Sequence, residues 1–291
     1  MVLADLTAGA VEDAERRALT RPLADVERDA LARPASRDAL AALAPADRVK
    51  IIAEVKRASP SRGALADIPD PALQASLYEQ GGASAISVLT EERRFGGSLA
   101  DLEAVTAGVS LPVLRKDFIA TPYQVLEARA AGADLALLIV AGLSLSTLHE
   151  LHALILELGM TPLVETHSAE ELEVAIDLGA SLIGVNARNL KTLELDRDLF
   201  ARLADRIPDT AIRVAESAVL APDDVRRYRE AGADVVLIGE ALVTGDPVAT
   251  LSRFLEAGSM AVRGQKKSKC DVLSERSETK CDVLSERSES K

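Results

Sequence analysis

One pattern occurs four times between residues 79 and 239, and it constrains the fold more than any other feature. Each copy is a helix end, a glycine, an alanine, a Ser or Asp, and then an unbroken apolar run. The copies are EQGGASAISVL (79–89), RAAGADLALLIV (129–140), IDLGASLIGVN (176–186) and REAGADVVLIG (229–239). Glycine ends a helix cheaply in the left-handed conformation. A run that is apolar on both faces is typical of a parallel strand covered by helices. The chain is therefore predicted to alternate helices with buried parallel strands.

Completing this alternation gives eight strands with helical segments between them. They are expected at residues 51–56, 84–90, 112–118, 134–140, 161–166, 181–188, 211–217 and 234–240. Eight strand–helix units in a chain of this length favour a (β/α)8 TIM barrel, which typically takes about 250 residues. The alternative is a doubly wound open sheet, which usually carries G-x-G-x-x-G after its first strand, whereas this chain has KRASPSRG (56–63). We predict an α/β protein, a barrel with an N-terminal helical extension over residues 1–50.

The last 34 residues differ from the rest of the chain. CDVLSERSETK (270–280) is followed at once by CDVLSERSESK (281–291), a tandem copy that differs at one position. Two copies are too few to build a solenoid, which needs at least about three. We predict that residues 1–257 fold as a single barrel domain and that residues 258–291 form a disordered tandem-repeat tail added to it. The alternative is a small functional tail.

Truncation after residue 258 should leave activity and melting temperature unchanged. The repeats contain too few apolar residues to order themselves against the barrel. Thermal melting and an activity assay on the full and the truncated chain would check this expectation. A melting temperature lower by several degrees in the truncated chain would show instead that the tail packs on the barrel.

Composition excludes several classes of function. The net charge of −12 argues against general nucleic-acid binding, which requires a basic face. No apolar run approaches the roughly 20 residues of a membrane span, and the acidic N-terminal segment is unlike a secretion signal. Both cysteines, Cys270 and Cys281, lie in the repeats, so the body has neither a disulfide framework nor a cysteine metal site. We expect a cytoplasmic monomer. We also expect no metal, because the three histidines are not grouped with acids at ligand spacing.

Acids, bases and amides collect where the predicted strands end. In IIAEVKRASPSRG (51–63), Glu54 and Lys56 are in phase on one face of the first strand, because side chains two residues apart point the same way. Four more strand ends carry such groups: Lys116 with Phe118, Glu165, Asn186 with Arg188, and Glu216 with Ser217. The carboxyl ends of barrel strands are where active sites form.

Each of these residues alone has a simpler interpretation, as a solvated rim residue or half of a structural ion pair. Five strand ends together favour a site, because burying several charges in one mouth costs several kcal/mol unless they are paired or used. His149 and His152 fit a surface or packing role. His167, next to Glu165 at the mouth, fits a loop position, and the alternative is that it influences the site. Gly239 and the helix start after it resemble a phosphate site.

Several segments together closely resemble the indole-3-glycerol phosphate synthase family. They are IIAEVKRASPSRG (51–63), ISVLTEERRFGGS (86–98), LPVLRKDFIATPYQ (111–124), LVETHS (163–168), IGVNARNLKTLELD (183–196) and RVAESAV (213–219). The resemblance covers about residues 1–257, and its most specific parts are the E-V-K-R-x-S-P-S and L-R-K-D-F motifs.

This resemblance implies a reaction without cofactor or metal. The phosphorylated substrate 1-(2-carboxyphenylamino)-1-deoxyribulose 5-phosphate closes to indole-3-glycerol phosphate and loses CO2 and water. Such a step needs an acid on the ketone oxygen, an acid to expel the hydroxyl and a base. The implied catalytic residues are Glu54, Lys56, Lys116, Glu165, Asn186 and Glu216. The implied substrate-binding residues are Ser59, Ser87, Phe95, Phe118, Arg188, Ser217 and Gly239.

The resemblance also assigns roles within this set. Lys116 is the implied acid for ring closure, and Lys56 pairs with the substrate carboxylate and serves as acid in dehydration. Glu165 is a base or stabilises a cationic intermediate, and Glu54 tunes the lysines or is itself the base. Phe95 and Phe118 form an apolar wall for the aromatic ring, or else ordinary core.

The chain departs from the family at Ala218, where the usual sequence is E-S-G. A Cβ at this turn puts phosphate affinity in doubt more than the acid–base chemistry. Two rival interpretations stay open at this stage: a different phosphate-binding enzyme on the same fold, and a catalytically weakened barrel that acts as a scaffold.

Overall fold

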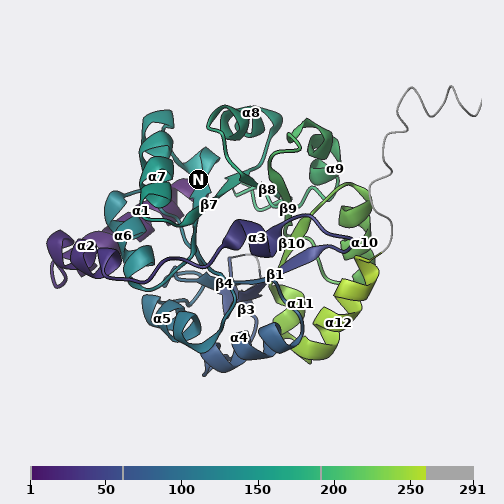
Figure 1. The fold of residues 1–291 in the computed structure, drawn as a ribbon, viewed down its shortest axis with the longest axis horizontal. Coiled ribbons are helices and arrows are strands. Elements are labelled where there is room, and N and C mark those ends of the chain that lie inside the picture. Colours follow the sequence, from purple (N-terminus) through teal and green to yellow (C-terminus); the bar gives the residue numbers. More distant parts are fainter. Residues whose placement is uncertain (1, 61, 191, 260–291) are drawn as a thin grey trace, which may run out of the picture. The chain divides into compact units, whose positions relative to one another are not determined.

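The computed structural model describes residues 2–60, 62–190 and 192–259 (Figure 1). Eight parallel strands close into a barrel in the order β1-β10-β9-β8-β7-β6-β5-β4. Their bounds are β1 Lys50–Val55, β4 Ala85–Leu89, β5 Val113–Lys116, β6 Leu135–Ile139, β7 Thr161–Thr166, β8 Leu182–Asn186, β9 Ile212–Glu216 and β10 Val235–Ile238. Each strand pairs with its neighbour along the chain, and β1 pairs with β10 to close the ring. The predicted (β/α)8 barrel is confirmed, although β5, β8 and β10 end two residues before the predicted limits.

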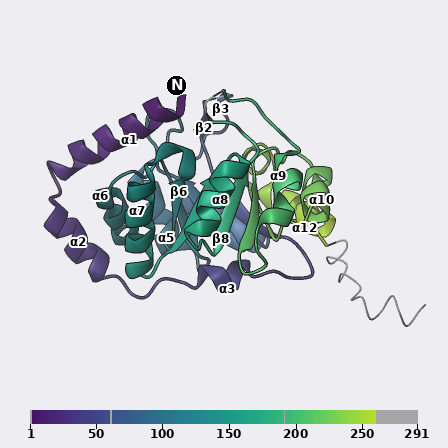
Figure 2. The ribbon, with the colours of Figure 1, turned by 90° about the horizontal axis from the view of Figure 1, so that it is seen from above.

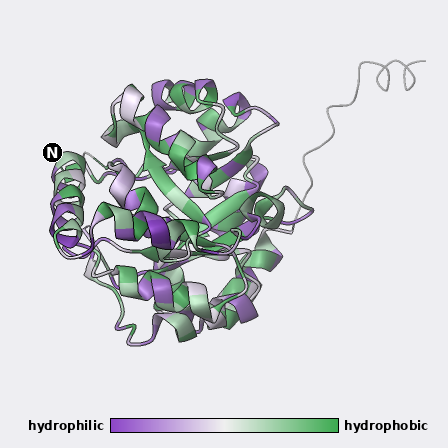
Figure 3. Cartoon of the chain, turned by 60° about the vertical axis from the view of Figure 1, so that its left-hand side comes forward, coloured by the Kyte–Doolittle hydropathy of each residue, from purple (hydrophilic) through white to green (hydrophobic). Residues whose placement is uncertain are grey.

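Strand alternation divides the core into two layers. Inward side chains such as Ile52, Leu137 and Leu163 form one buried cluster inside the barrel. Outward side chains such as Ile51 and Val164 form a larger cluster beneath the surrounding helices. In Figure 3 the strands at the centre are mostly hydrophobic, and hydrophilic residues recur on the helices around them. This two-sided burial explains why the strands are continuously apolar in sequence.

Helices follow the strands around the barrel. They are α4 Pro71–Gln80, α5 Leu99–Gly108, α6 Pro122–Ala130, α7 Leu145–Glu157, α8 Ala169–Asp177, α9 Leu199–Leu203, α10 Pro222–Glu230, α11 Glu240–Val243 and α12 Pro247–Ala257, with the short 3-10 turns η1 Val140–Gly142 and η2 Ala204–Arg206. Side-chain caps such as Ser168 on α8 begin several of them. The glycines of the four repeated seams all have positive φ, between 75° and 95°, so the predicted left-handed helix ends are confirmed.

Three helices precede the barrel, as predicted for the N-terminal extension: α1 Val2–Ala18, α2 Leu23–Leu31 and α3 Ala39–Leu43. Ala39 and Leu43 of α3 pack with the residues inside the barrel. Figure 2 shows α1 and the small hairpin of β2 (Ala58–Ser59) and β3 (Gly63–Ala64) at the opposite end of the barrel from α3. The extension therefore reaches both ends, and α1 lies at the end where the strands terminate.

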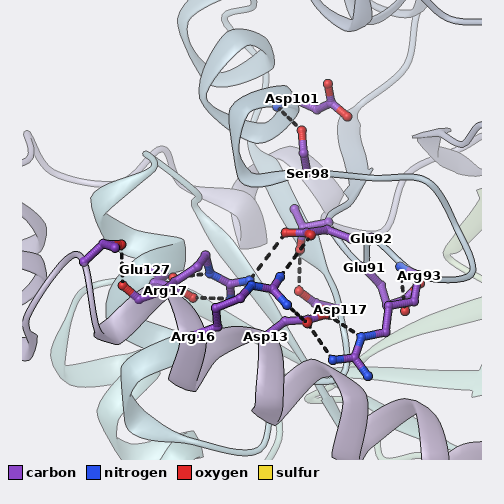
Figure 4. Close-up of polar contacts among 12 residues, drawn as sticks. Asp13, Arg16, Arg17, Glu91, Glu92, Arg93, Ser98, Asp101, Asp117 and Glu127 are labelled. Carbon is purple, nitrogen blue, oxygen red and sulfur yellow. Dashed lines mark hydrogen bonds and ion pairs between the residues drawn. The ribbon is translucent and has the colours of Figure 1, made fainter.

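Ion pairs hold α1 in place at this end (Figure 4). Arg17 donates to both carboxylate oxygens of Glu127 on α6, at 2.6 and 2.8 Å. Arg93, in the loop after β4, donates to Asp13 at 2.9 and 2.7 Å. The side chain of Asp13 is buried, so this pair is less screened by solvent than one on an open surface.

Among the described residues, no helix is long and apolar enough to span a membrane. The predicted tail at 258–291 lies almost wholly outside the described residues.

Candidate active site

A cavity of about 400 Å³ opens at the carboxyl ends of the strands. Twelve of the thirteen site residues proposed from the sequence border it: Glu54, Lys56, Ser59, Phe95, Lys116, Phe118, Glu165, Asn186, Arg188, Glu216, Ser217 and Gly239. Leu6 of α1 also borders it, so the N-terminal extension supplies part of the wall. The barrel thus brings together groups that lie up to 185 positions apart, from Glu54 to Gly239.

Ser87 is the exception. It lies on β4 beside Glu54 in the strand register, is completely buried, and does not border the cavity. Its hydroxyl donates to Glu54 Oε2 at 3.3 Å. On the other side of the same carboxylate, Lys56 Nζ lies 3.4 Å from Oε1. Glu54 is therefore held between a hydroxyl behind it and an ammonium in front.

Gly239 stands next to this pair at the end of β10. A Cβ at Gly239 would lie 2.7 Å from Glu54 Oε1 and 3.4 Å from Lys56 Cδ. The glycine therefore leaves room for the side chains of β1, in addition to the close backbone approach to phosphate expected from the sequence.

Lys116 is the centre of the charge cluster. Its Nζ lies 3.1 Å from Glu165 Oε2 on β7 and 3.5 Å from Glu216 Oε2 on β9. Both carboxyl groups are fully enclosed, with at most 1% of each side chain exposed. One ammonium thus serves two buried carboxyl groups from different strands.

These neighbours shift the pKa values of Lys116, Glu165 and Glu216 in different directions. Burial disfavours the charged ammonium, but Glu165, Glu216 and Glu54 outweigh it and raise the pKa of Lys116. Burial also opposes ionisation of Glu165, but Lys116, His167 and Asn186 lower its pKa. Burial and the adjacent Glu165 raise the pKa of Glu216. At neutral pH the cluster therefore contains a protonated Lys116 and an ionised Glu165, and Glu216 is the carboxyl that keeps a proton most readily.

Asn186 connects β7, β8 and the turn after β9. Its Nδ2 donates to Glu165 Oε1 at 3.1 Å. Its Oδ1 accepts from Ser217 Oγ at 2.8 Å and from the backbone N–H of Arg188 at 3.0 Å. Because both ends of the amide are bonded, Asn186 fixes the orientation of the Glu165 carboxylate.

Phe95 and Phe118 form the apolar side of the cavity. Their ring centroids are 6.1 Å apart, and Lys56 Nζ lies 5.8 Å from the centroid of Phe95. Phe95 is placed by Glu91, a buried carboxylate that accepts the backbone N–H groups of residues 93, 94 and 95 at 2.7–3.1 Å. A flat aromatic group entering the cavity would meet these rings on one side and the charge cluster on the other.

The turn after β9 has an uncommon backbone. Ser217 and Ala218 both have positive φ, at 69° and 62°. This left-handed conformation costs a residue with a Cβ about 1–2 kcal/mol. It explains why glycine would suit position 218, where the resemblance implies one.

We expect Ala218→Gly to raise the melting temperature and lower KM, with kcat little changed. Relief of the backbone strain at Ala218 should outweigh the added conformational freedom of the unfolded chain. The net gain in the free energy of unfolding should be about 1 kcal/mol or less. Contacts to a phosphate remote from the reacting atoms act on KM rather than on kcat. Thermal melting and steady-state kinetics on the same variant measure both effects.

Ala44 provides the matched control, because it is partly buried but has φ −52°. Ala44→Gly should lower stability by up to about 1 kcal/mol, since only the unfolded chain changes. A lower melting temperature in Ala218→Gly as well would show that the turn is not strained.

Glu240, the residue after Gly239, is paired with an arginine in the structure. Arg62, from the hairpin after β1, donates its Nε to Glu240 Oε1 at 2.9 Å and its Nη2 to the same oxygen. Both side chains border the cavity. The acid is therefore not an unpaired negative charge at the mouth.

The sequence did not identify Gly184 and Glu91 as parts of the site, and it left the influence of His167 on the site open. A Cβ at Gly184 would lie 2.1 Å from Glu216 Oε1, so this glycine in β8 makes room for the carboxyl of β9. A glycine inside a strand is a known signal of such close approach, and IGVN contained it. His167 lies in the loop between β7 and α8, as predicted, and its Nε2 is 3.1 Å from Glu165 Oε1. Nothing in the local sequence around Glu91 indicated its backbone contacts.

Comparisons of the sequence with known proteins find one family. The family model described as indole-3-glycerol phosphate synthase matches residues 3–254. The indole-3-glycerol phosphate synthase of Leifsonia xyli is 72% identical over 253 residues, which cover 87% of this chain and 97% of the relative. That of Mycolicibacterium gilvum is 56% identical over 259 residues, 89% of this chain and 95% of the relative.

A solved structure, thiamine phosphate pyrophosphorylase from Pyrococcus furiosus, shares the fold at a TM-score of 0.55. Its sequence is 13% identical to this one, and the matched region covers 74% of this chain and 98% of the solved chain. At this identity the likeness concerns the fold alone.

Proposed function

The chain belongs to the indole-3-glycerol phosphate synthase family, and from this premise we propose that it converts 1-(2-carboxyphenylamino)-1-deoxyribulose 5-phosphate to indole-3-glycerol phosphate, CO2 and water. The observation that carries the proposal is that Lys56 and Lys116, from β1 and β5, border one cavity together with Glu165. Two ammonium groups and a carboxylate around a small enclosed volume are what a condensation driven by acids and a base requires.

In the first step the ring carbon that bears the carboxylate attacks the ketone carbon. Lys116 donates a proton to the ketone oxygen as the new carbon–carbon bond forms. The bond to the carboxylate then breaks, CO2 leaves, and its electron pair restores the aromatic ring. The neighbouring carboxyl groups keep Lys116 charged, so it enters the step in the protonated form that an acid needs.

In the second step the hydroxyl leaves as water. Lys56, which pairs with the substrate carboxylate before CO2 is lost, supplies the proton for the departing hydroxyl. Glu165 removes a proton from the adjacent carbon to complete the indole, with Glu54 as the alternative base beside Lys56. Asn186 and Glu216 orient the hydroxyl groups and the amine of the substrate.

Binding is divided between two sides of the cavity. Phe95 and Phe118 take the aromatic ring. The phosphate lies at the ends of β8, β9 and β10, with Arg188, Ser217 and Gly239, and Ser59 closes the site from β2. Ser87 acts indirectly, through its hydrogen bond to Glu54.

Residues 1–257 supply every group in this scheme. We therefore propose that they are one catalytic domain that works as a cytoplasmic monomer on a small phosphorylated substrate, with neither metal nor cofactor.

The test is to incubate the purified protein with the proposed substrate and to follow indole fluorescence together with CO2 release. The two products should appear in equal amounts. A substrate analogue without the ring carboxylate should compete for binding and release no CO2. Absence of indole product at saturating substrate would refute the proposed function.

A further inference from the structure

Two buried carboxyl groups, Glu165 and Glu216, share one ammonium in the active site. Lys116 Nζ lies 3.1 Å from the first and 3.5 Å from the second. Two adjacent enclosed carboxyl groups do not both ionise cheaply, so one of them tends to hold a proton. Lys116 does not determine which one, because it contacts both at similar distances.

His167 distinguishes the two carboxyl groups. Its Nε2 lies 3.1 Å from Glu165 Oε1, within ion-pair distance but outside hydrogen-bonding geometry. Its Nδ1 lies 3.2 Å from Glu171 Oε2 on α8, and its backbone N–H donates to that oxygen at 2.7 Å. The imidazole is thus enclosed between a carboxylate of the site and a carboxylate of the surrounding helix layer.

Glu216 lacks a comparable support. Within the described part of the chain, neither of its oxygens has a hydrogen-bond partner. Glu165 has Lys116 on one oxygen, with Asn186 and His167 on the other. The asymmetry is built from β5, β8 and the turn after β7, and it does not depend on a bound ligand.

We propose that His167 is a positioning residue that supports the Glu165 carboxylate from behind and thereby makes Glu165, not Glu216, the ionised member of the pair. His167 does not border the cavity, so it acts through Glu165. The inference rests on the proposed function only where it assigns Glu165 as the base. The ionisation pattern itself belongs to the free protein.

The charge of His167 follows from its surroundings. Burial disfavours the imidazolium, but Glu165 and Glu171 outweigh this and raise its pKa to about 9. These carboxylates act on the ring from β7 and α8. The turn η1, which packs on both elements, carries no titratable side chain. His167 is therefore positively charged at neutral pH, and it stabilises a negative charge on Glu165 in a place that solvent does not reach.

The direct test is 13C NMR of protein labelled at the glutamate carboxyl carbon. The signals of Glu165 and Glu216 are identified by their loss in Glu165→Gln and Glu216→Gln. In the unaltered protein at pH 7 we expect a carboxylate signal for Glu165 and a carboxylic-acid signal for Glu216. In His167→Gln, which keeps a neutral donor, the midpoint of Glu165 should rise by about one unit or more, because a neighbouring cation is lost.

Two further variants separate this role from packing. Glu171→Gln keeps an acceptor for the backbone N–H of His167 but removes one of the two charges that hold its proton, so it should shift Glu165 in the same direction by less. His152→Gln is the matched control, because His152 is also buried but lies on α7. It should leave both midpoints unchanged. An unchanged Glu165 midpoint in His167→Gln would overturn the proposal.

Kinetics give a second readout. A higher Glu165 pKa moves the acidic limb of the plot of kcat against pH to higher pH. His167→Gln should therefore lose about tenfold in kcat on that limb and recover at alkaline pH, with KM little changed. The stability contributed by the raised His167 pKa is complete below pH 6.5 and disappears as the pH rises through about 9. The difference in melting temperature between the unaltered protein and His167→Gln should therefore shrink over that range. If the protein forms no indole but Glu165 still shifts in the NMR titration, the proposed function fails and this inference stands.

Discussion

Lys116→Ala is expected to abolish turnover while the protein stays folded. The variant loses the acid for ring closure, which typically contributes about 10²–10⁴-fold to the rate. It also removes the cation that does most to lower the pKa of Glu165, so the base holds a proton more readily. The combined loss in kcat should therefore reach or exceed the upper end of that range. Indole fluorescence under saturating substrate measures kcat, and circular dichroism measures folding.

Lys50→Ala is the matched control. Lys50 begins β1, at the opposite end of the barrel from the cavity, and is also partly buried. Its removal should leave kcat unchanged within about twofold, since no group of the site depends on its charge. A Lys116→Ala variant with near-normal kcat would exclude Lys116 as the acid and would require Lys56 to carry both protonation steps.

Strand periodicity was enough to predict which way the charged side chains at the strand ends point. Side chains two apart share a face, so the inward direction of Glu54 also fixed that of Lys56, and both border the cavity. The seams with glycine and a following apolar run located the strands and gave the barrel. The carboxyl ends of barrel strands then located the site. These inferences need only local sequence and the topology of the fold.

Contacts between strands could not be predicted in the same way. The closeness of Gly184 to Glu216 depends on the register in which Asn186 pairs with Glu216 across β8 and β9. The contact of His167 with Glu171 depends on how the first turn of α8 packs beside the end of β7. Register and helix packing follow from the whole ring, and no window of sequence contains them.

Arg115→Met is expected to destabilise the barrel more than any other single change considered above. Arg115 precedes Lys116 in β5 and points the opposite way, toward α6, where its side chain is completely buried. It donates to Asp117 Oδ2 at 2.9 Å and to the carbonyl of Gln124 at 2.6 Å, and it lies 3.4 Å from Glu127 Oε2. Methionine fills similar space but leaves a buried carboxylate without its cation, which typically costs about 3–5 kcal/mol in the free energy of unfolding. Urea denaturation followed by circular dichroism measures the loss.

Arg226→Met is the matched control, because Arg226 pairs with Asp223 on the exposed face of α10. It should cost less than about 1 kcal/mol. Adding Asp117→Asn to Arg115→Met should recover part of the lost stability, because the remaining amide carries no charge to desolvate. A loss below about 1 kcal/mol in Arg115→Met would mean that packing alone holds this layer.

The two neighbours in β5 should therefore fail in different ways. Asp117, which Arg115 holds, also accepts the backbone N–H of Phe118 at 2.8 Å and so shapes the turn that carries the aromatic wall. Arg115→Met should consequently raise KM in the fraction that remains folded. Lys116→Ala should lower kcat and lose less stability, because Glu216 can hold a proton and Glu165 keeps His167 and Asn186. Equal losses of stability in both variants would contradict this division, because they would show that the inward and outward charges of the strand form one network.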